Sequence, residues 1–137
     1  MNKLKSYIVA CITSQKSAWR VLFEAIEQAH VRSTGLRIVV CPNLIRQECS
    51  YDVTQDFLAK LQHAAENKCL EYGINLQIDT IDYGSDDVSS VPEIVDEGDT
   101  ELLVMTDPPV KNKLFDRIFD KTKKLIRACN CSVLIIR

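Results

Sequence analysis

The stretch Glu101-Leu102-Leu103-Val104-Met105-Thr106 contains four apolar residues in a row, without the alternation of a half-exposed strand. A strand buried on both faces has such a continuous apolar run, whereas a strand with one solvated face alternates apolar and polar residues. The run Val133-Leu134-Ile135-Ile136 near the end of the chain has the same character. Both runs therefore predict strands of a sheet that is covered on both faces.

Similar β-branched runs recur along the chain and alternate with segments whose apolar residues have helical spacing. The predicted strands are 6–12, 36–41, 74–82, 101–106 and 132–136. The predicted helices are one capped by Ser17 and ended by Gly35, one over 54–72 ended by Gly73, one over about 87–96, and one after Pro108-Pro109. This alternation predicts a doubly wound α/β sandwich with a mainly parallel five-stranded sheet and four helices.

The first two predicted helices each have one apolar face that can be buried against the sheet. In the first helix this face consists of Val21, Leu22, Ala25, Ile26 and Ala29. In the second it consists of Phe57, Leu58, Leu61, Ala64, Ala65 and Leu70. These residues are the predicted helical part of the core.

Length and composition favour one globular domain over residues 1–137, with 46% hydrophobic and 26% charged residues. No apolar run approaches the roughly 18 residues of a membrane span. The first residues also lack the pattern of a secretory signal peptide. We therefore expect a cytoplasmic protein without a membrane partner, and the net charge of −2 argues against a nucleic-acid partner.

Charge is unevenly distributed along the second half of the chain. Residues 69–110 contain eleven acidic residues and no Lys or Arg, whereas 111–127 contain seven basic and two acidic residues. Such blocks are usually solvated faces, and the alternative is a basic surface for a phosphate or an acidic partner. The basic stripe of the last predicted helix consists of Lys113, Arg117, Lys121 and Lys124.

The sequence offers little for catalysis or metal binding, so we expect no enzyme, no catalytic residue, no cofactor and no metal site. The two histidines, His30 and His63, fall on helix flanks, and no Walker, G-x-G-x-x-G or G-x-S-x-G motif is present. Cys129 and Cys131 lack the spacing of a zinc knuckle. The six cysteines are expected to be reduced, and Cys49, in a polar segment, is the one to test for reactivity.

Polar residues that follow the first predicted strand form the candidate phosphate-binding segment. Thr13, Ser14, Lys16 and Ser17 offer hydroxyl groups, a cation and a helix N-terminus, which together suit an anion. The alternative is ordinary helix capping with an exposed lysine. Lys111 and Lys113 follow the fourth predicted strand and are the further candidates to reach the same phosphate.

The chain as a whole resembles the universal stress protein (UspA-like) family. The resemblance rests on Ile8-Val9-Ala10-Cys11 with Ser14 and Ser17, on Glu93-Ile94-Val95 followed by the 101–105 run, and on Cys131-Ser132-Val133-Leu134-Ile135-Ile136-Arg137 at the end. It implies a sheet in the order 3-2-1-4-5 and a homodimer formed through the last strand, with Val133, Leu134, Ile135 and Ile136 at the interface. An exposed apolar edge strand favours such pairing.

Nucleotide-binding members of that family carry an Asp at the end of the first strand and a G-x2-G-x9-G-(S/T) signature after the fourth. Here Ile12 stands at the Asp position. Thr106, Pro109 and Phe119 stand where the glycines belong, with Asp120 at the hydroxyl position. The chain is thus similar to a divergent branch without the ATP motif, a branch that includes stress-protein domains of potassium-sensing histidine kinases, some of which bind cyclic di-AMP.

Two functional hypotheses follow. The first is a non-enzymatic homodimeric stress-response protein that acts through contacts with an unknown protein partner, its ATP site lost. The second is a nucleotide sensor for an adenine nucleotide or cyclic di-AMP, which uses the segment Thr13–Ser17 with Lys111 and Lys113.

Overall fold

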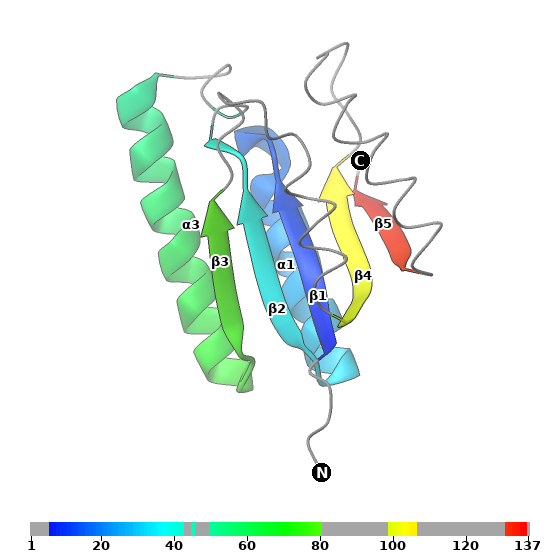
Figure 1. Ribbon diagram of the computed structural model, residues 1–137. Coiled ribbons are helices and arrows are strands. Elements are labelled where there is room, and N and C mark those ends of the chain that lie inside the picture. The colour runs from blue at the N-terminus through cyan, green and yellow to red at the C-terminus, as the bar shows by residue number, and fades with distance from the viewer. Residues whose placement is uncertain (1–5, 43–44, 46–49, 81–98, 107–130, 137) are drawn as a thin grey trace.

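Five parallel strands form one sheet in the order β3-β2-β1-β4-β5, as Figure 1 shows. The computed structural model describes residues 6–42, 45, 50–80, 99–106 and 131–136. The strands are β1 (Ser6–Ile12), β2 (Gly35–Val40), β3 (Leu76–Thr80), β4 (Asp99–Thr106) and β5 (Ser132–Ile136). The predicted α/β architecture and strand order are therefore confirmed.

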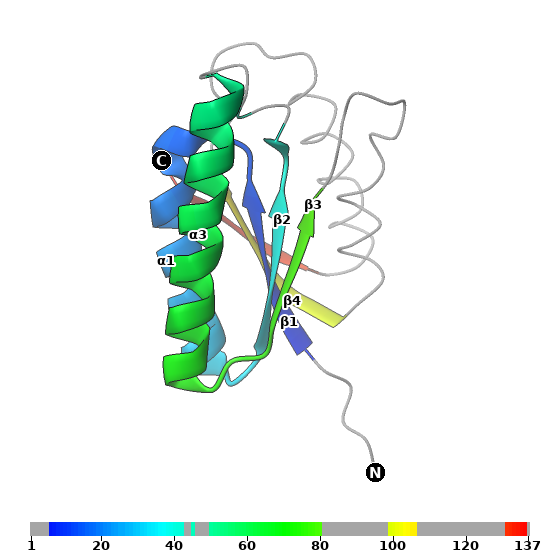
Figure 2. The same ribbon diagram turned by 90° about the vertical axis from the view of Figure 1, so that its left-hand side faces the viewer.

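Two long helices cover one face of this sheet. Helix α1 (Gln15–Arg32) follows β1, and helix α3 (Tyr51–Tyr72) precedes β3. Figure 2 shows both on the same side of the strands. The third and fourth predicted helices, 87–96 and the one after Pro108-Pro109, lie outside the described residues. Within the described segments, no helix has the length and apolarity of a membrane span.

Helix α1 begins and ends earlier than the sequence predicted. Its N-cap is Ser14, not Ser17: the extended Ser14 backbone lets the side-chain oxygen accept a hydrogen bond from the Lys16 amide at 3.2 Å. At the other end Ser33 adopts the left-handed conformation, with φ of 57°, and ends the helix before Gly35. The predicted start was wrong because Ser14 already caps the helix before Ser17 is reached, and the predicted end was wrong because Ser33 ends the helix before Gly35.

Gly35 has a different role from the predicted helix stop. It begins β2, where an added Cβ would lie 2.8 Å from the Tyr7 ring. The missing side chain thus allows the aromatic ring of β1 to lie directly against the β2 backbone.

Helix α3 ends where predicted, at Gly73, which has a positive φ of 68°. It starts earlier than predicted, because the Ser50 side chain accepts a hydrogen bond from the Val53 amide at 3.3 Å. Leu70, a predicted core residue, is 83% exposed. Phe57, Leu61, Ala65 and Cys69 follow a strict four-residue spacing and form the buried row, so Cys69 takes the inward position that was assigned to Leu70.

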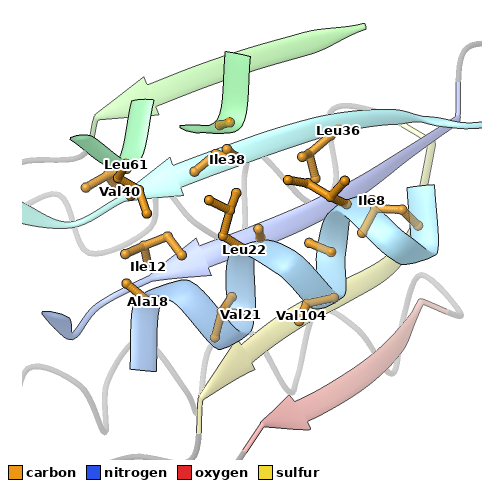
Figure 3. Packing of buried hydrophobic residues seen from close by; sticks show 14 of the residues in the cluster. Ile8, Ile12, Ala18, Val21, Leu22, Leu36, Ile38, Val40, Leu61 and Val104 are labelled. Atoms are coloured by element: carbon orange, nitrogen blue, oxygen red, sulfur yellow. The ribbon is translucent and has the colours of Figure 1, made fainter. Parts of the chain in front are cut away.

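The core lies between the helices and the sheet, and β1 runs through its centre. Ile8, Ala10 and Ile12 belong to the buried cluster under the helices, while Val9 and Cys11 alternate with them and are also buried. Figure 3 shows Leu22 of α1 among Ile12 and Ile38 of the neighbouring strands. All five residues predicted for the inner face of α1 are buried. The apolar runs of β1 and β4 are therefore buried, as predicted, whereas the prediction of two covered faces was wrong for β5, where Val133 is 37% exposed.

We predict that Leu22→Ala lowers the free energy of unfolding by about 2–5 kcal/mol, the usual loss when a large buried side chain leaves a cavity. Leu22 is fully buried in the cluster between α1 and the sheet. Urea denaturation followed by circular dichroism measures the change. The exposed Lys60→Ala on α3 is the control and is expected to change stability by less than about 1 kcal/mol. A loss of that small size for Leu22→Ala would contradict the packing described for this cluster.

Candidate functional site

The candidate site lies at the carboxyl edge of the sheet, the edge at which the parallel strands end. The strand order reverses between β1 and β4, because the chain moves outward from β1 to β2 and β3 and then returns to the other side of β1. In open parallel sheets, ligands bind at such a switch point, beyond the carboxyl ends of the strands. Thr13 follows β1 directly, and Thr106 ends β4 at the same edge.

Thr13 and Ser14 connect β1 to α1 and are both buried, but their hydroxyl groups differ in what they contact. The Ser14 oxygen accepts the capping hydrogen bond from Lys16. The Thr13 side chain is only 5% exposed, and its Oγ1 has no hydrogen-bond partner among the described residues. A buried hydroxyl without a partner is costly, so Thr13 is the member of this segment best suited to meet a polar ligand atom.

Lys16 and Ser17 lie in the first turn of α1, where Lys16 is exposed and Ser17 is partly exposed. That turn contains no acidic residue to neutralise the positive end of the helix dipole. The segment thus combines an exposed ammonium group, helix amides and the Thr13 hydroxyl, an arrangement that suits an anion. The structure brings four predicted residues together here, whereas Lys111 and Lys113 lie outside the described residues.

Two positions that the family resemblance singled out are occupied by other interactions. Ile12 is fully buried, and its side chain belongs to the cluster under the helices. The Thr106 hydroxyl donates a hydrogen bond to the Ile136 carbonyl at 3.2 Å and so joins β4 to β5. Sequence reasoning missed this contact. The only feature of the sequence that pointed to this contact was the expected pairing of two apolar strands. Such pairing predicts backbone hydrogen bonds, but it does not predict a hydrogen bond from a side chain.

The predicted interface residues form most of β5, at the outer end of the sheet next to β4. Val133 is 37% exposed, and the three residues after it are partly buried. Leu134 and Ile136 pack against the central cluster. Val133 and Ile135 alternate with them and therefore lie on the opposite face.

Both histidines are exposed and lie on helices. His63 is hydrogen-bonded to Asn67 on the outer surface of α3, with 3.1 Å between Nε2 and Nδ2. His30 lies in the last turn of α1 and stacks on Tyr72, with ring centroids 4.4 Å apart. Neither histidine belongs to the candidate phosphate-binding segment Thr13–Ser17. Among the described residues, no group of three His, Cys, Asp or Glu side chains is placed to hold a metal ion.

Four cysteines lie within the described residues, and all are buried free thiols: Cys11, Cys41, Cys69 and Cys131. Burial raises the pKa of Cys69 to about 11 from an ordinary value of 9.0. Burial also raises the pKa of Cys131, and a backbone hydrogen bond involving Leu103 offsets part of that increase. Both thiols therefore stay protonated near neutral pH. Cys49 lies outside the described residues.

Known structures share this fold over its whole length, whereas no protein-family model and no curated protein matches the sequence. A universal stress protein in complex with cAMP has a TM-score of 0.62 at 16% identity, over 98% of each chain. The universal stress protein of Archaeoglobus fulgidus in complex with dAMP has a TM-score of 0.56 at 17% identity, over 100% of each chain. A universal stress family protein of Burkholderia pseudomallei has a TM-score of 0.57 at 17% identity, over 99% of this chain and 98% of that one.

These likenesses establish the fold class. The chain has the universal stress protein fold, in agreement with the resemblance that its strand sequences suggested. At such low identity they do not carry over the residues of any ligand site, so the assignment of Thr13, Ser14, Lys16 and Ser17 remains a prediction.

We predict that Cys69 of the folded protein is nearly inert toward thiol reagents at pH 8, because only the thiolate reacts. A pKa of about 11 instead of 9.0 lowers the thiolate fraction about a hundredfold at that pH. Mass spectrometry after a short pulse of iodoacetamide measures the labelling of each cysteine. The same pulse in urea is the control, and Cys69 is expected to be labelled there. Rapid labelling of Cys69 in the folded protein would contradict its buried position.

Proposed function

We propose that this chain is a non-enzymatic stress-response protein that forms a homodimer and acts through contacts with other proteins. The likeness to the fold of universal stress proteins supports the assignment as a stress-response protein. The observation that supports a homodimer is the apolar outer strand β5. Within the described residues, its only strand neighbour is β4. A cytoplasmic location and an unknown protein partner remain parts of this proposal.

The two ends of the sheet differ in chemistry, and the difference favours β5 as the interface. The outer strand β3 carries Gln77, Asp79 and Thr80, and the Asp79 carboxylate accepts a hydrogen bond from Arg37 Nε at 2.9 Å. Charged and polar residues on an edge strand oppose pairing with another chain. Strand β5 has no charged residue between Ser132 and Ile136. Of the two edges, β5 is therefore the one open to a second copy.

Pairing at β5 would satisfy both the backbone and the side chains of that strand. An unpaired edge presents amide and carbonyl groups that a second strand can bind. The partly exposed Val133 and Ile135 would lose solvent contact at the same time. In a twofold dimer the same strand contributes from each copy, so each apolar residue gains a matching surface.

We predict that Val133→Glu and Ile135→Glu each convert the dimer to a monomer, because the carboxylates of the two copies would lie close together and repel. Light scattering coupled to size exclusion should show the mass falling from twice 15.5 kDa to 15.5 kDa. Gln77→Glu on the exposed surface of β3 is the matched control and should remain dimeric. Leu134 is unsuitable, because it packs against the core and a charge there would disturb folding. A dimer that persists in both β5 variants would exclude this edge as the interface.

A nucleotide sensor is the second candidate, and Thr13 is the observation that favours it. The buried Thr13 hydroxyl has no partner among the described residues, and it lies beside the unneutralised start of α1. Two proteins of the same fold are described in complex with cAMP and dAMP. An adenine nucleotide or cyclic di-AMP with a phosphate at α1 would use Thr13, Lys16 and Ser17. This site is separate from β5, so the protein can have both properties.

We predict for this candidate that ATP, AMP, cAMP or cyclic di-AMP at about 1 mM raises the melting temperature of the wild-type protein. A ligand at 100 times its dissociation constant adds about 2.7 kcal/mol, which shifts melting by several degrees. Lys16→Ala and Thr13→Val should each reduce the shift without changing the dimer mass. Lys60→Ala on α3 is the control and should keep the full shift. A flat response of the wild-type protein to all four nucleotides would exclude the sensor.

A further inference from the structure

Strand β5 is attached to the sheet along one side only. It pairs with β4, from Leu102 opposite Ser132 to Thr106 opposite Ile136. Within the described residues, β4 is its only strand neighbour. The parts of a fold with few stabilising contacts open first, and an outer strand with one neighbour is such a part. The interactions at its two ends therefore decide how much of β5 keeps the conformation of a strand.

The amino end and the middle of β5 are anchored to the core. Cys131, the residue before the strand, is only 7% exposed, and a backbone hydrogen bond involving Leu103 joins it to β4. The Leu134 side chain packs against the central cluster. These contacts hold the first part of the strand independently of Thr106.

The carboxyl end of β5 is attached through the side chain of Thr106. The Thr106 hydroxyl donates a hydrogen bond to the Ile136 carbonyl at 3.2 Å, and the two residues lie opposite each other in the strand pair. Thr106 is 7% exposed, and Ile136 is partly buried. A hydrogen bond in such a place is electrostatically stronger than the same bond in water. The Ile136 side chain packs against the central cluster, and the bond from Thr106 fixes its backbone as well.

The position of the Ile136 backbone affects both ends of a dimer formed through β5. In a twofold dimer the two β5 strands run beside each other in opposite directions. When the pair is centred on Leu134, Ile136 of one copy lies opposite Ser132 of the partner subunit. Symmetry repeats this contact at the other end of the pair. If the Ile136 backbone leaves the strand, the intermolecular pair is therefore shortened at both ends.

We propose that Thr106 is a positioning residue for the dimer, because its hydroxyl holds the carboxyl end of β5 in the conformation that pairs with a second copy. The proposal rests on the β5 homodimer proposed above. Thr106 lies on β4, so β5 separates it from the second copy. It acts through Ile136: a strand that already has its bound conformation loses less conformational freedom when it associates.

The test must separate the dimer from general stability, because the loss of a buried hydrogen bond destabilises a protein wherever it lies. Thr54 provides the matched control. It is fully buried on α3, and its hydroxyl donates a hydrogen bond to the Ser50 carbonyl at 2.8 Å. Figure 1 shows α3 beside β3, at the opposite end of the sheet from β5. Thr54→Val therefore removes a comparable bond far from the dimer strand.

The first experiment measures the dissociation constant of the dimer by sedimentation velocity over a dilution series. Thr106→Val is expected to raise it about tenfold, the size of effect typical of one intramolecular hydrogen bond. Thr106→Ser retains the hydroxyl and should stay close to the wild-type value, as should Thr54→Val. A wild-type dimer whose dissociation constant is unchanged by Thr106→Val, or raised equally by Thr54→Val, would overturn this proposal alone. A wild-type monomer would overturn the homodimer and this proposal together.

The second experiment asks whether the end of β5 opens before any second copy binds. It compares amide hydrogen exchange, followed by mass spectrometry, in Val133→Glu with that in Val133→Glu combined with Thr106→Val. We expect peptides that cover β5 to exchange about tenfold faster in the double variant, because the lost bond no longer opposes local opening. Peptides from β1, in the centre of the sheet, should exchange at the same rate in both. Unchanged exchange in β5, or equal acceleration in β1, would overturn the proposal.

Discussion

The burial of β1 on both faces is the constraint on which the rest of the structure depends. Ile8, Ala10 and Ile12 face the helices, Val9 and Cys11 face the other way, and all five are buried. Parallel pairing with β2 on one side and β4 on the other satisfies its backbone. A parallel strand in this position needs crossover connections, which place α1 and α3 on the sheet. The strand order then reverses beside β1, and Thr13 lies at the point of reversal.

The same arrangement separates three surfaces that have different chemistry. The carboxyl edge presents the start of α1 with Thr13 and Lys16, which suits an anion. The amino edge presents helix C-termini, where Arg32 of α1 forms an ion pair with Glu101 of β4. The outer strand β5 presents apolar side chains. Because parallel strands all point one way, each edge of the sheet gathers helix ends of a single polarity. A ligand at the carboxyl edge and a second copy at β5 would therefore contact different residues.

Sequence reasoning succeeded for the strands and failed at the helix boundaries for a definite reason. β1 and β5 have the predicted bounds, since each is a continuous apolar run, although only β1 is buried throughout most of its length. Several hydroxyl residues lie around the start of α1, and Ser14 takes the capping role in place of Ser17. Apolar spacing alone also assigned Leu70 to the core, although the buried row of α3 continues through Cys69. Local patterns identify an apolar face only to within one helical position.

The sequence by itself determined the α/β class, the five strands and the buried face of α1, because apolar periodicity records burial one residue at a time. The candidate segment Thr13–Ser17 could also be predicted from the sequence, because its residues are neighbours in the chain. Only the tertiary structure decided that the Thr13 hydroxyl lacks a partner and that Arg32 lies beside Glu101. Those two charges are far apart in the sequence and meet only because β4 pairs with β1 next to the end of α1. No local pattern contains that contact, because strand pairing and helix packing create it.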